Sequence, residues 1–278
     1  MVQPTEHDHM RGLSRTPIQR RSALGLLAGA GLLLVGCGSK SETASGSTTS
    51  TTSTTSTTST TSAATAATAT SCAEIPEETG GPYPGDGTNG PNVLTQDGVV
   101  RSDIRSSFGS ATGTAEGVPL TIELEVVDVA NGCQPLAGAA VYAWHCNREG
   151  EYSLYSSGLE NVNYLRGVQE ADANGKVTFT SIFPAAYSGR WPHVHFEVYS
   201  SLADAVAAGT PVKTSQLAFP KATCDVVYAS TGYEQSVSNL AQTSLDGDMV
   251  FGDGSDHQMA TMSGSVENGY AAALQVGV

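Results

Sequence analysis

Short stretches in which apolar and polar residues alternate recur from residue 120 onward in this 278-residue chain. Over residues 120–126, Leu, Ile, Leu and Val occupy every second position, and Thr or Glu lies between them. Successive side chains of a β-strand point to opposite faces of a sheet, so this period is typical of half-buried strands. Similar runs cover residues 139–146, 176–183, 193–200 and 212–219. The alternation predicts a domain built mainly from strands.

Residue pairs that favour tight turns separate these runs, because glycine and asparagine tolerate the backbone angles that turns require. They are Asn131-Gly132, Asn174-Gly175, Ser188-Gly189 and Asp246-Gly247. We expect short helices only over residues 201–208 and 235–242. Several short strands joined by turns of this kind predict an all-β fold, an antiparallel β-sandwich with long loops and one or two short helices.

The first 36 residues have the features of an export signal. Arg20-Arg21 precede a short apolar run over residues 23–36, and small residues lead directly to Cys37. The run is shorter than the roughly 20 residues that a membrane span needs. The ending resembles a bacterial lipobox, which predicts a lipid on Cys37 and anchoring on the extracytoplasmic face of the cell membrane. The paired arginines favour the twin-arginine route, and ordinary Sec export is the alternative.

Residues 37–71 are predicted to be a disordered tether. From residue 41 onward this segment consists almost wholly of Ser, Thr, Ala and Gly, with a repeated Thr-Thr-Ser unit. It has no large apolar side chain, so burial cannot offset the entropy that folding costs. Residues 72–278 are therefore the predicted folded domain, and their length is that of one domain.

Composition excludes some classes of function. The chain has 13 Lys+Arg against 27 Asp+Glu, a net charge of −14, which argues against nucleic acid or an anionic membrane surface as a partner. No glycine-rich loop opens a predicted helix, so no nucleotide site is indicated. The Gly-x-Ser-x-Gly motif of many hydrolases is also absent.

Four cysteines follow Cys37, namely Cys72, Cys133, Cys146 and Cys224. An even number of cysteines in an exported domain predicts two disulfides, and three pairings are possible. We favour Cys72–Cys133 and Cys146–Cys224, and buried free thiols are the alternative.

The segment from Tyr187 to His195 contains the strongest candidate site. Residues i and i+2 of a strand face the same side, so His193 and His195 can present two imidazoles together. With phenolic oxygens, Tyr152 among them, they form a mixed nitrogen and oxygen set that suits trivalent iron better than zinc. Two alternatives stay open: an ordinary strand with tolerated core histidines, and a zinc or copper His-x-His site.

Six segments carry a resemblance to a known family. They are residues 76–83, 101–104, 144–153, 165–169, 187–195 and 215–217. Through them the chain resembles the intradiol ring-cleavage dioxygenases, and among these the secreted members that consist of the catalytic core. The family consists of non-haem iron(III) enzymes. They cleave catechols between the two hydroxyls, put both atoms of O2 into the product, and yield cis,cis-muconate-type diacids.

The resemblance implies one iron(III) per chain, bound by Tyr152, Tyr187, His193 and His195. It also implies that Tyr187 leaves the metal when a small aromatic diol binds and takes up a substrate proton, so Tyr187 has a catalytic role. A phenol with a pKa near 10 suits both the metal-bound and the released tyrosine. A bound cation ionises the phenol, and once the phenolate leaves the cation it is basic enough to accept a proton.

The resemblance implies further residues for substrate binding and catalysis. Arg190 occupies the position of a family arginine whose permanent charge would stabilise developing negative charge. Gln216 matches a family glutamine near the substrate, and Tyr83 resembles a substrate-pocket residue. We do not expect His145 to bind the metal, because four ligands are supplied without it. His257 is expected to be solvated.

The remaining predictions concern residues 246–256, two differences from the family, and one alternative function. Residues 246–256 are expected to be turns, because Val250 breaks the EF-hand calcium pattern. The loop between Tyr187 and His193 is short, and the helical segment with which catechol 1,2-dioxygenases dimerise is missing, so a monomer and a homodimer both stay possible. The alternative from another class is a non-catalytic β-sandwich binding module.

Overall fold

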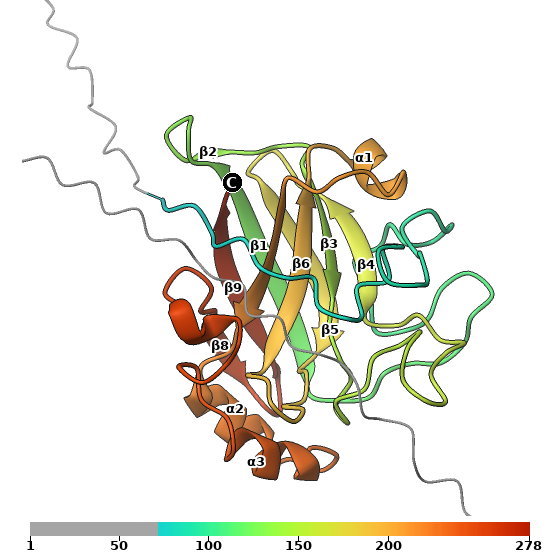
Figure 1. Ribbon diagram of the computed structural model, residues 1–278, viewed down its shortest axis with the longest axis vertical. Helices are drawn as coiled ribbons and strands as arrows, with labels where there is room; N and C mark the ends of the chain where they lie inside the picture. The colour runs from blue at the N-terminus through green and yellow to red at the C-terminus, as the bar shows by residue number, and fades with distance from the viewer. Residues whose placement is uncertain (1–71) are drawn as a thin grey trace, which may run out of the picture. The chain divides into compact units, whose positions relative to one another are not determined.

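The computed structural model describes residues 72–278 (Figure 1). The predicted export signal over residues 1–36, the lipidation site at Cys37 and the tether over residues 37–71 lie outside the described residues. Among the described residues, no helix has both the length and the apolar character needed to cross a membrane.

The first of two sheets has five strands. They are β1 (Pro119–Asp128), β2 (Gln134–Pro135), β5 (Lys176–Ile182), β8 (Thr261–Ser265) and β9 (Gly269–Gly277). The order is β2-β1-β9-β8, and β5 pairs with β1 over most of its length. The predicted strands over residues 120–126 and 176–183 are thus neighbours in this sheet.

The second sheet has four strands and carries most of the candidate site. They are β3 (Ala140–Trp144), β4 (Arg166–Glu170), β6 (His193–Tyr199) and β7 (Lys213–Ala218). The order is β4-β3-β6-β7, with every neighbouring pair antiparallel. All seven residues of β6 are buried, because β6 is an inner strand covered on both faces.

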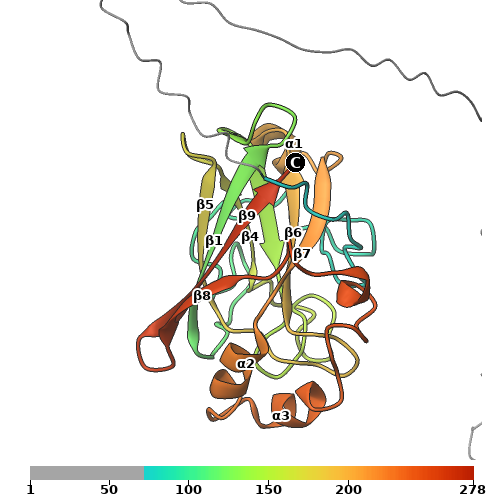
Figure 2. The same ribbon diagram turned by 90° about the vertical axis from the view of Figure 1, so that its left-hand side faces the viewer.

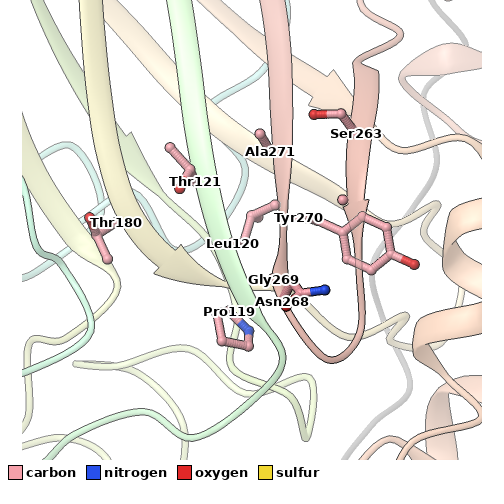
Figure 3. A pocket seen from close by; sticks show the side chains of 10 residues that line it. Pro119, Leu120, Thr121, Thr180, Ser263, Asn268, Gly269, Tyr270 and Ala271 are labelled. Carbon is pink, nitrogen blue, oxygen red and sulfur yellow. The ribbon is translucent and has the colours of Figure 1, made fainter.

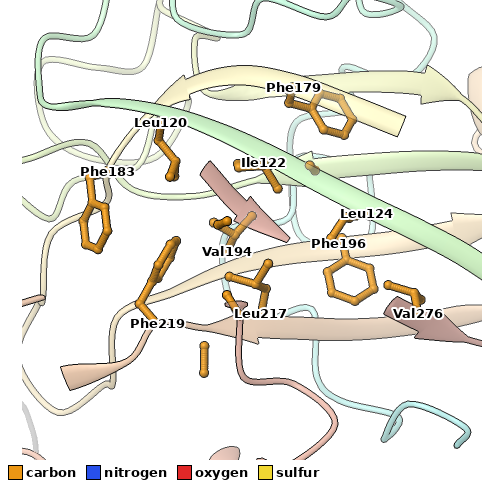
Figure 4. Close-up of a cluster of buried hydrophobic side chains, with 14 of the residues drawn as sticks. Leu120, Ile122, Leu124, Phe179, Phe183, Val194, Phe196, Leu217, Phe219 and Val276 are labelled. Atoms are coloured by element: carbon orange, nitrogen blue, oxygen red, sulfur yellow. The ribbon is translucent and has the colours of Figure 1, made fainter. Parts of the chain in front are cut away.

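One hydrophobic core joins residues of both sheets. Leu120, Ile122 and Leu124 of β1 lie against Val194 and Phe196 of β6, as Figure 4 shows. Each of these side chains is at most 1% exposed, and full burial of one stabilises the fold by roughly 1.5–3 kcal/mol. The alternate residues of β6, which include the two histidines, therefore face away from this core.

The two-sheet, mainly β fold is confirmed, and the predicted antiparallel arrangement holds for every pair of neighbouring strands in the described residues except one. β1 and β9 run parallel, from the pair Leu120–Tyr270 to the pair Val127–Gly277. A tight hairpin imposes the antiparallel direction on β8 and β9. No hairpin joins β1 to β9, which lie some 150 residues apart in the chain, so their direction is free of that constraint. Figures 1 and 2 show the two strands side by side.

Three short α-helices are present in the described part of the chain. α1 (Leu202–Val206) and α3 (Glu234–Leu240) lie in the two predicted helical segments, whereas α2 (Lys221–Val227) was not predicted. Pro220 precedes the first helical residue of α2, where its missing N–H costs nothing, and Cys224 and Val227 are buried. Figures 1 and 2 place α2 and α3 together at one end of the sheets.

One of the two predicted disulfides is present. Cys72 is bonded to Cys133, whereas Cys146 and Cys224 are free and buried, so the predicted Cys146–Cys224 bond is wrong. The two thiols point at different backbone carbonyls. Cys146 Sγ lies 3.7 Å from the Ala185 oxygen, and Cys224 Sγ lies 4.0 Å from the Phe219 oxygen. Burial raises the pKa of the Cys146 thiol to about 12, which keeps it protonated and unreactive.

Candidate metal and substrate site

Four side chains implied as ligands converge at the start of β6. His193 and His195 point to the same face, and their Nε2 atoms lie 3.0 Å apart. Tyr187 comes from the loop before β6, and its Oη lies 3.3 Å from His193 Nε2. Tyr152 comes from the loop that follows β3, and its ring centroid lies 5.9 Å from that of Tyr187 and 6.3 Å from that of His195. Strand pairing and two loops thus bring together residues 43 positions apart.

The hydrogen bonds around this cluster turn the His193 Nε2 lone pair toward it and leave the Tyr152 hydroxyl unpaired in the described part of the chain. His193 Nδ1 contacts the Trp191 carbonyl oxygen, which can only accept, so the proton belongs on Nδ1 and the lone pair of Nε2 faces the cluster. The Tyr152 hydroxyl is buried and has no hydrogen-bond partner among the described residues. A buried phenol without a partner is unusual in folded proteins, because leaving it unsatisfied costs about 1–3 kcal/mol.

Burial also sets the charge states of this cluster. Burial, reinforced by the charge of Arg190, lowers the pKa of His193 to about 3, and burial lowers the pKa of His195 well below its ordinary value. Both imidazoles are therefore neutral, the form that binds a metal. Burial raises the pKa of Tyr187 to about 12 and that of Tyr152 well above 10. A cation between them would reverse that effect by favouring the phenolates.

The chemistry of these donors fits a hard trivalent ion. Within residues 72–278, no group of three or more His, Cys, Asp or Glu side chains could hold a metal. A metal at this cluster therefore needs the two tyrosines as well as the two imidazoles. Phenolate oxygens and neutral nitrogens suit Fe(III) and lack the thiolate character that favours zinc or copper(I). The residues present therefore fit the implied iron.

Stacking and packing hold the cluster in place. The Trp144 indole lies parallel to the His195 ring, with centroids 4.9 Å apart and an interplanar angle of 4°. The glycine at 81 also lies close, because a Cβ there would be 3.3 Å from His195 Cε1. His195 is therefore confined between Trp144 of β3 and the loop that contains Gly81.

Arg190 is buried beside this cluster and is held from two sides. Its Nε donates to Asp248 Oδ2 at 2.9 Å, and Nη2 donates to Gln216 Oε1 at 2.7 Å. Gln216 is completely buried, and its Nε2 donates to the Thr79 carbonyl at 2.9 Å. The structure thus brings together Arg190 and Gln216, the two polar residues that the resemblance implied.

Asp248 is a site residue that sequence reasoning missed. It lies in a stretch that was expected only to form turns, and it is 4% exposed. Besides the Arg190 bond, Asp248 accepts from the N–H groups of Trp191 at 2.6 Å, Val250 at 2.8 Å and Phe251 at 3.2 Å. The apolar pair that follows the aspartate was the available signal, because buried Val250 and Phe251 draw the turn into the core.

A cavity of about 610 Å³ opens next to the tyrosines. It is lined by Thr79, Gly81, Pro82, Tyr83, Gly150, Tyr152, Ser156, Tyr187, Ser188, Arg190 and Met249. Three of the residues implied for chemistry or substrate, Tyr83, Tyr187 and Arg190, thus share one space. Another hollow, of about 350 Å³, lies against β1 and the β8–β9 hairpin (Figure 3), and its lining has no acidic, basic, histidine or cysteine side chain.

Arg166 positions the loops around this cavity, a role not recognised from its place in the 165–169 segment. It is fully buried, and its Nη1 donates to the Pro84 carbonyl at 2.7 Å. Its Nη2 donates to the carbonyls of Tyr83 at 2.9 Å and Ser153 at 3.0 Å. One guanidinium therefore ties the loop of Tyr83 to the loop that contains Tyr152. The ring centroids of Tyr83 and Tyr152 lie 4.9 Å apart.

The two other histidines considered do not belong to the cluster of tyrosines and histidines. His145 is buried, with Nδ1 2.7 Å from the Cys146 carbonyl oxygen and Nε2 2.6 Å from Ser181 Oγ. Both ring nitrogens are thus occupied. His257 is exposed.

Known proteins share sequence and fold with this chain. The family described as Dioxygenase matches residues 90–248, more than half of the chain. The solved structure of an intradiol ring-cleavage dioxygenase from Tetranychus urticae superposes with a TM-score of 0.57 and 25% identity, over 74% of this chain and 94% of that one. Catechol 1,2-dioxygenase 2 from Acinetobacter lwoffii is 40% identical over 55 residues. That segment is 20% of this chain and 20% of the relative. The chain belongs to the intradiol ring-cleavage dioxygenase family.

Proposed function

We propose that this protein binds one iron(III) through Tyr152, Tyr187, His193 and His195 and cleaves catechol-type aromatics with O2. Cleavage between the two hydroxyl-bearing carbons would put both oxygen atoms into a cis,cis-muconate-type diacid. The observation that carries the proposal is the convergence of two imidazole nitrogens and two phenol oxygens beside a 610 Å³ cavity. Membership of the family supports the same reaction.

Each residue would have a distinct part in this reaction. Bound iron(III) would withdraw electron density from a chelated catecholate and make the ring reactive toward O2. Tyr152 and Tyr187, as phenolates, would neutralise cationic charge in a site where the histidines stay neutral. Tyr187 also lines the cavity, so its Oη can accept a proton from a substrate hydroxyl. Its pKa, raised by burial to about 12 without a cation, makes the released phenolate a strong base.

Arg190 would act on the substrate by charge. The guanidinium lies at the cavity, and Asp248 and Gln216 fix its orientation before substrate enters. A preoriented cation needs no reorganisation when negative charge develops on the ring or its oxygens, which is the condition for electrostatic catalysis. Removal of one such group typically lowers kcat by about 10²–10³-fold.

The test uses purified protein loaded with iron(III). Tyrosinate bound to Fe(III) absorbs visible light, so the loaded protein should be coloured and the zinc-loaded protein colourless. Catechol is added without oxygen, O2 is then admitted, and the product is analysed by mass. A product heavier than catechol by one O2 and identified as the muconate supports the proposal. A coloured protein that leaves catechol unchanged, or that yields a quinone, overturns it.

We further propose that the enzyme works outside the cytoplasm on a lipid anchor at Cys37. The support is the sequence pattern of Arg20-Arg21, a short apolar run and small residues before the cysteine. Cells that express the protein are fractionated, and Cys37→Ser is the comparison. The native chain should remain with the membrane fraction and take up labelled fatty acid. Equal labelling of the Cys37→Ser variant would contradict the assignment.

A further inference from the structure

We infer that the cavity selects uncharged catechols bearing an apolar substituent about the size of a second ring, in preference to catechols bearing a carboxylate. The inference rests on the proposed function only for which end of the cavity receives the diol. Three properties of the described residues support it: the size of the cavity, the character of its rim, and the state of its charges.

The cavity is larger than a single ring requires. A cavity of about 150 Å³ is enough to bind benzene, whereas the space beside Tyr152 and Tyr187 is about 610 Å³. It opens to solvent at Tyr83, which is 38% exposed, and at Met249, which is 80% exposed. A ring held at the tyrosines can therefore carry a substituent that extends toward these two side chains.

The rim offers apolar and aromatic contacts. Pro82, Tyr83 and Met249 lie on it, and all three are exposed. The Tyr83 ring lies 4.9 Å from Tyr152 and 5.2 Å from Tyr155, centroid to centroid, which makes a continuous aromatic surface. Aromatic side chains pack at such distances against further rings, and a thioether packs well on ring edges. An aryl substituent is therefore the complementary group.

The charges of the cavity disfavour an anionic substituent. Among the lining residues in the described part of the chain, Arg190 is the one with a charge, and it is committed to Asp248 and Gln216. Arg190 is largely buried, whereas the exposed lining residues Pro82, Tyr83 and Met249 have no charge. A carboxylate that reached this rim would thus lose water without gaining a cationic partner, which weakens binding.

The first experiment compares catechol, biphenyl-3,4-diol and 3,4-dihydroxybenzoate on the iron-loaded full-length enzyme. Dissociation constants are measured without oxygen by calorimetry, and kcat/KM is measured with oxygen. We expect biphenyl-3,4-diol to exceed 3,4-dihydroxybenzoate at least tenfold in both measurements. Equal or better binding of the carboxylate overturns the inference. Binding in the expected order without any ring cleavage would support the inference and overturn the proposed reaction.

The second experiment tests whether the substituent of the bound catechol contacts Met249. Met249→Lys adds a cation at the rim, and Met249→Gln is the uncharged comparison. Val226→Lys adds the same charge at an exposed position of α2 that does not line the cavity. At low salt we expect only Met249→Lys to raise the affinity for 3,4-dihydroxybenzoate relative to catechol, by about fivefold, and added salt to reduce the gain. An unchanged ratio in Met249→Lys, or the same gain in Val226→Lys, overturns the role of Met249.

Discussion

Asp248 and Arg190 form a buried ion pair in which Asp248 Oδ2 lies 2.9 Å from Arg190 Nε. The same oxygen accepts the Trp191 N–H at 2.6 Å, and the Trp191 carbonyl in turn contacts His193 Nδ1. One carboxylate therefore orients both the cation at the cavity and the backbone of Trp191, whose carbonyl contacts a proposed iron ligand. Partners of this kind tune metal sites and preorganise charged groups.

We expect Asp248→Asn to lower kcat at least tenfold while the protein keeps its iron colour. The neutral amide can no longer form an ion pair with the Arg190 guanidinium and hold its orientation. KM for catechol should change less than kcat. The matched control is Asp246→Asn, two residues earlier and exposed, which should keep the native rate. A loss of iron as large as the loss of rate would show that Asp248 acts on the metal cluster instead of on Arg190.

The same ion pair predicts how stability depends on pH. Burial alone would raise the pKa of Asp248, but the Trp191 N–H and the Arg190 side chain outweigh it and hold the pKa below its ordinary value. A carboxyl group with a lowered folded-state pKa stabilises the fold above its unfolded value of about 3.9 and loses that contribution as pH falls through the folded value. At pH 7 we expect the unfolding free energy of the native protein to exceed that of the Asp248→Asn variant by about 3–5 kcal/mol.

The measurement is chemical unfolding of both metal-free proteins at several pH values. The difference in unfolding free energy should be constant from pH 7 to about pH 5 and should shrink below about pH 4. A difference that grew on acidification would contradict the assigned direction of the pKa shift.

Sequence patterns identified the strands that alternate cleanly and missed those that do not. β1 and β5 pair along their length with one apolar face each, so the period of two was visible. β9 has three consecutive alanines and pairs with β1 from far along the chain. Neither composition nor a local turn marks such a strand, because its position depends on tertiary packing.

The candidate site was predictable to the extent that it lies in contiguous motifs. His193 and His195 follow from strand periodicity, and Tyr187 and Arg190 lie in the same segment. Asp248 joins them from a distant turn, through contacts that only the folded chain creates. The Cys146–Cys224 disulfide was predicted from the even number of cysteines, whereas the two thiols point to separate carbonyls in the folded chain.

Arg166→Lys is expected to destabilise the protein by about 1.5–3 kcal/mol or more, because an ammonium cannot reproduce the fork of donors that a buried guanidinium supplies. The bonds at risk are those to the Pro84, Tyr83 and Ser153 carbonyls. Arg148→Lys is the matched control, since Arg148 makes ion pairs with the largely exposed side chains Glu116 and Glu149. Its cost should stay within about 1 kcal/mol. Equal costs for the two variants would show that Arg166 does not hold the loops together.

Tyr152 and Tyr142 offer a paired test of whether the buried Tyr152 hydroxyl exists for a metal. The Tyr142 hydroxyl donates to the Pro84 carbonyl at 2.7 Å, whereas that of Tyr152 has no partner among the described residues. In metal-free protein, Tyr142→Phe should therefore cost about 0.5–1.5 kcal/mol of unfolding free energy, because it removes one buried hydrogen bond while the Pro84 carbonyl still accepts from Arg166. Tyr152→Phe should cost nothing or stabilise slightly, since it removes an unsatisfied group.

The order reverses when iron(III) is added. Tyr152→Phe should lose most of the iron affinity and the visible absorption, because it removes one of four donors. Tyr142→Phe should retain both, since its hydroxyl contacts Pro84 and Arg166 instead of the cluster. Iron is titrated into each metal-free variant, and absorption and bound metal are measured together. A Tyr152→Phe variant that is destabilised without metal and still binds iron with native colour would remove Tyr152 from the ligand set.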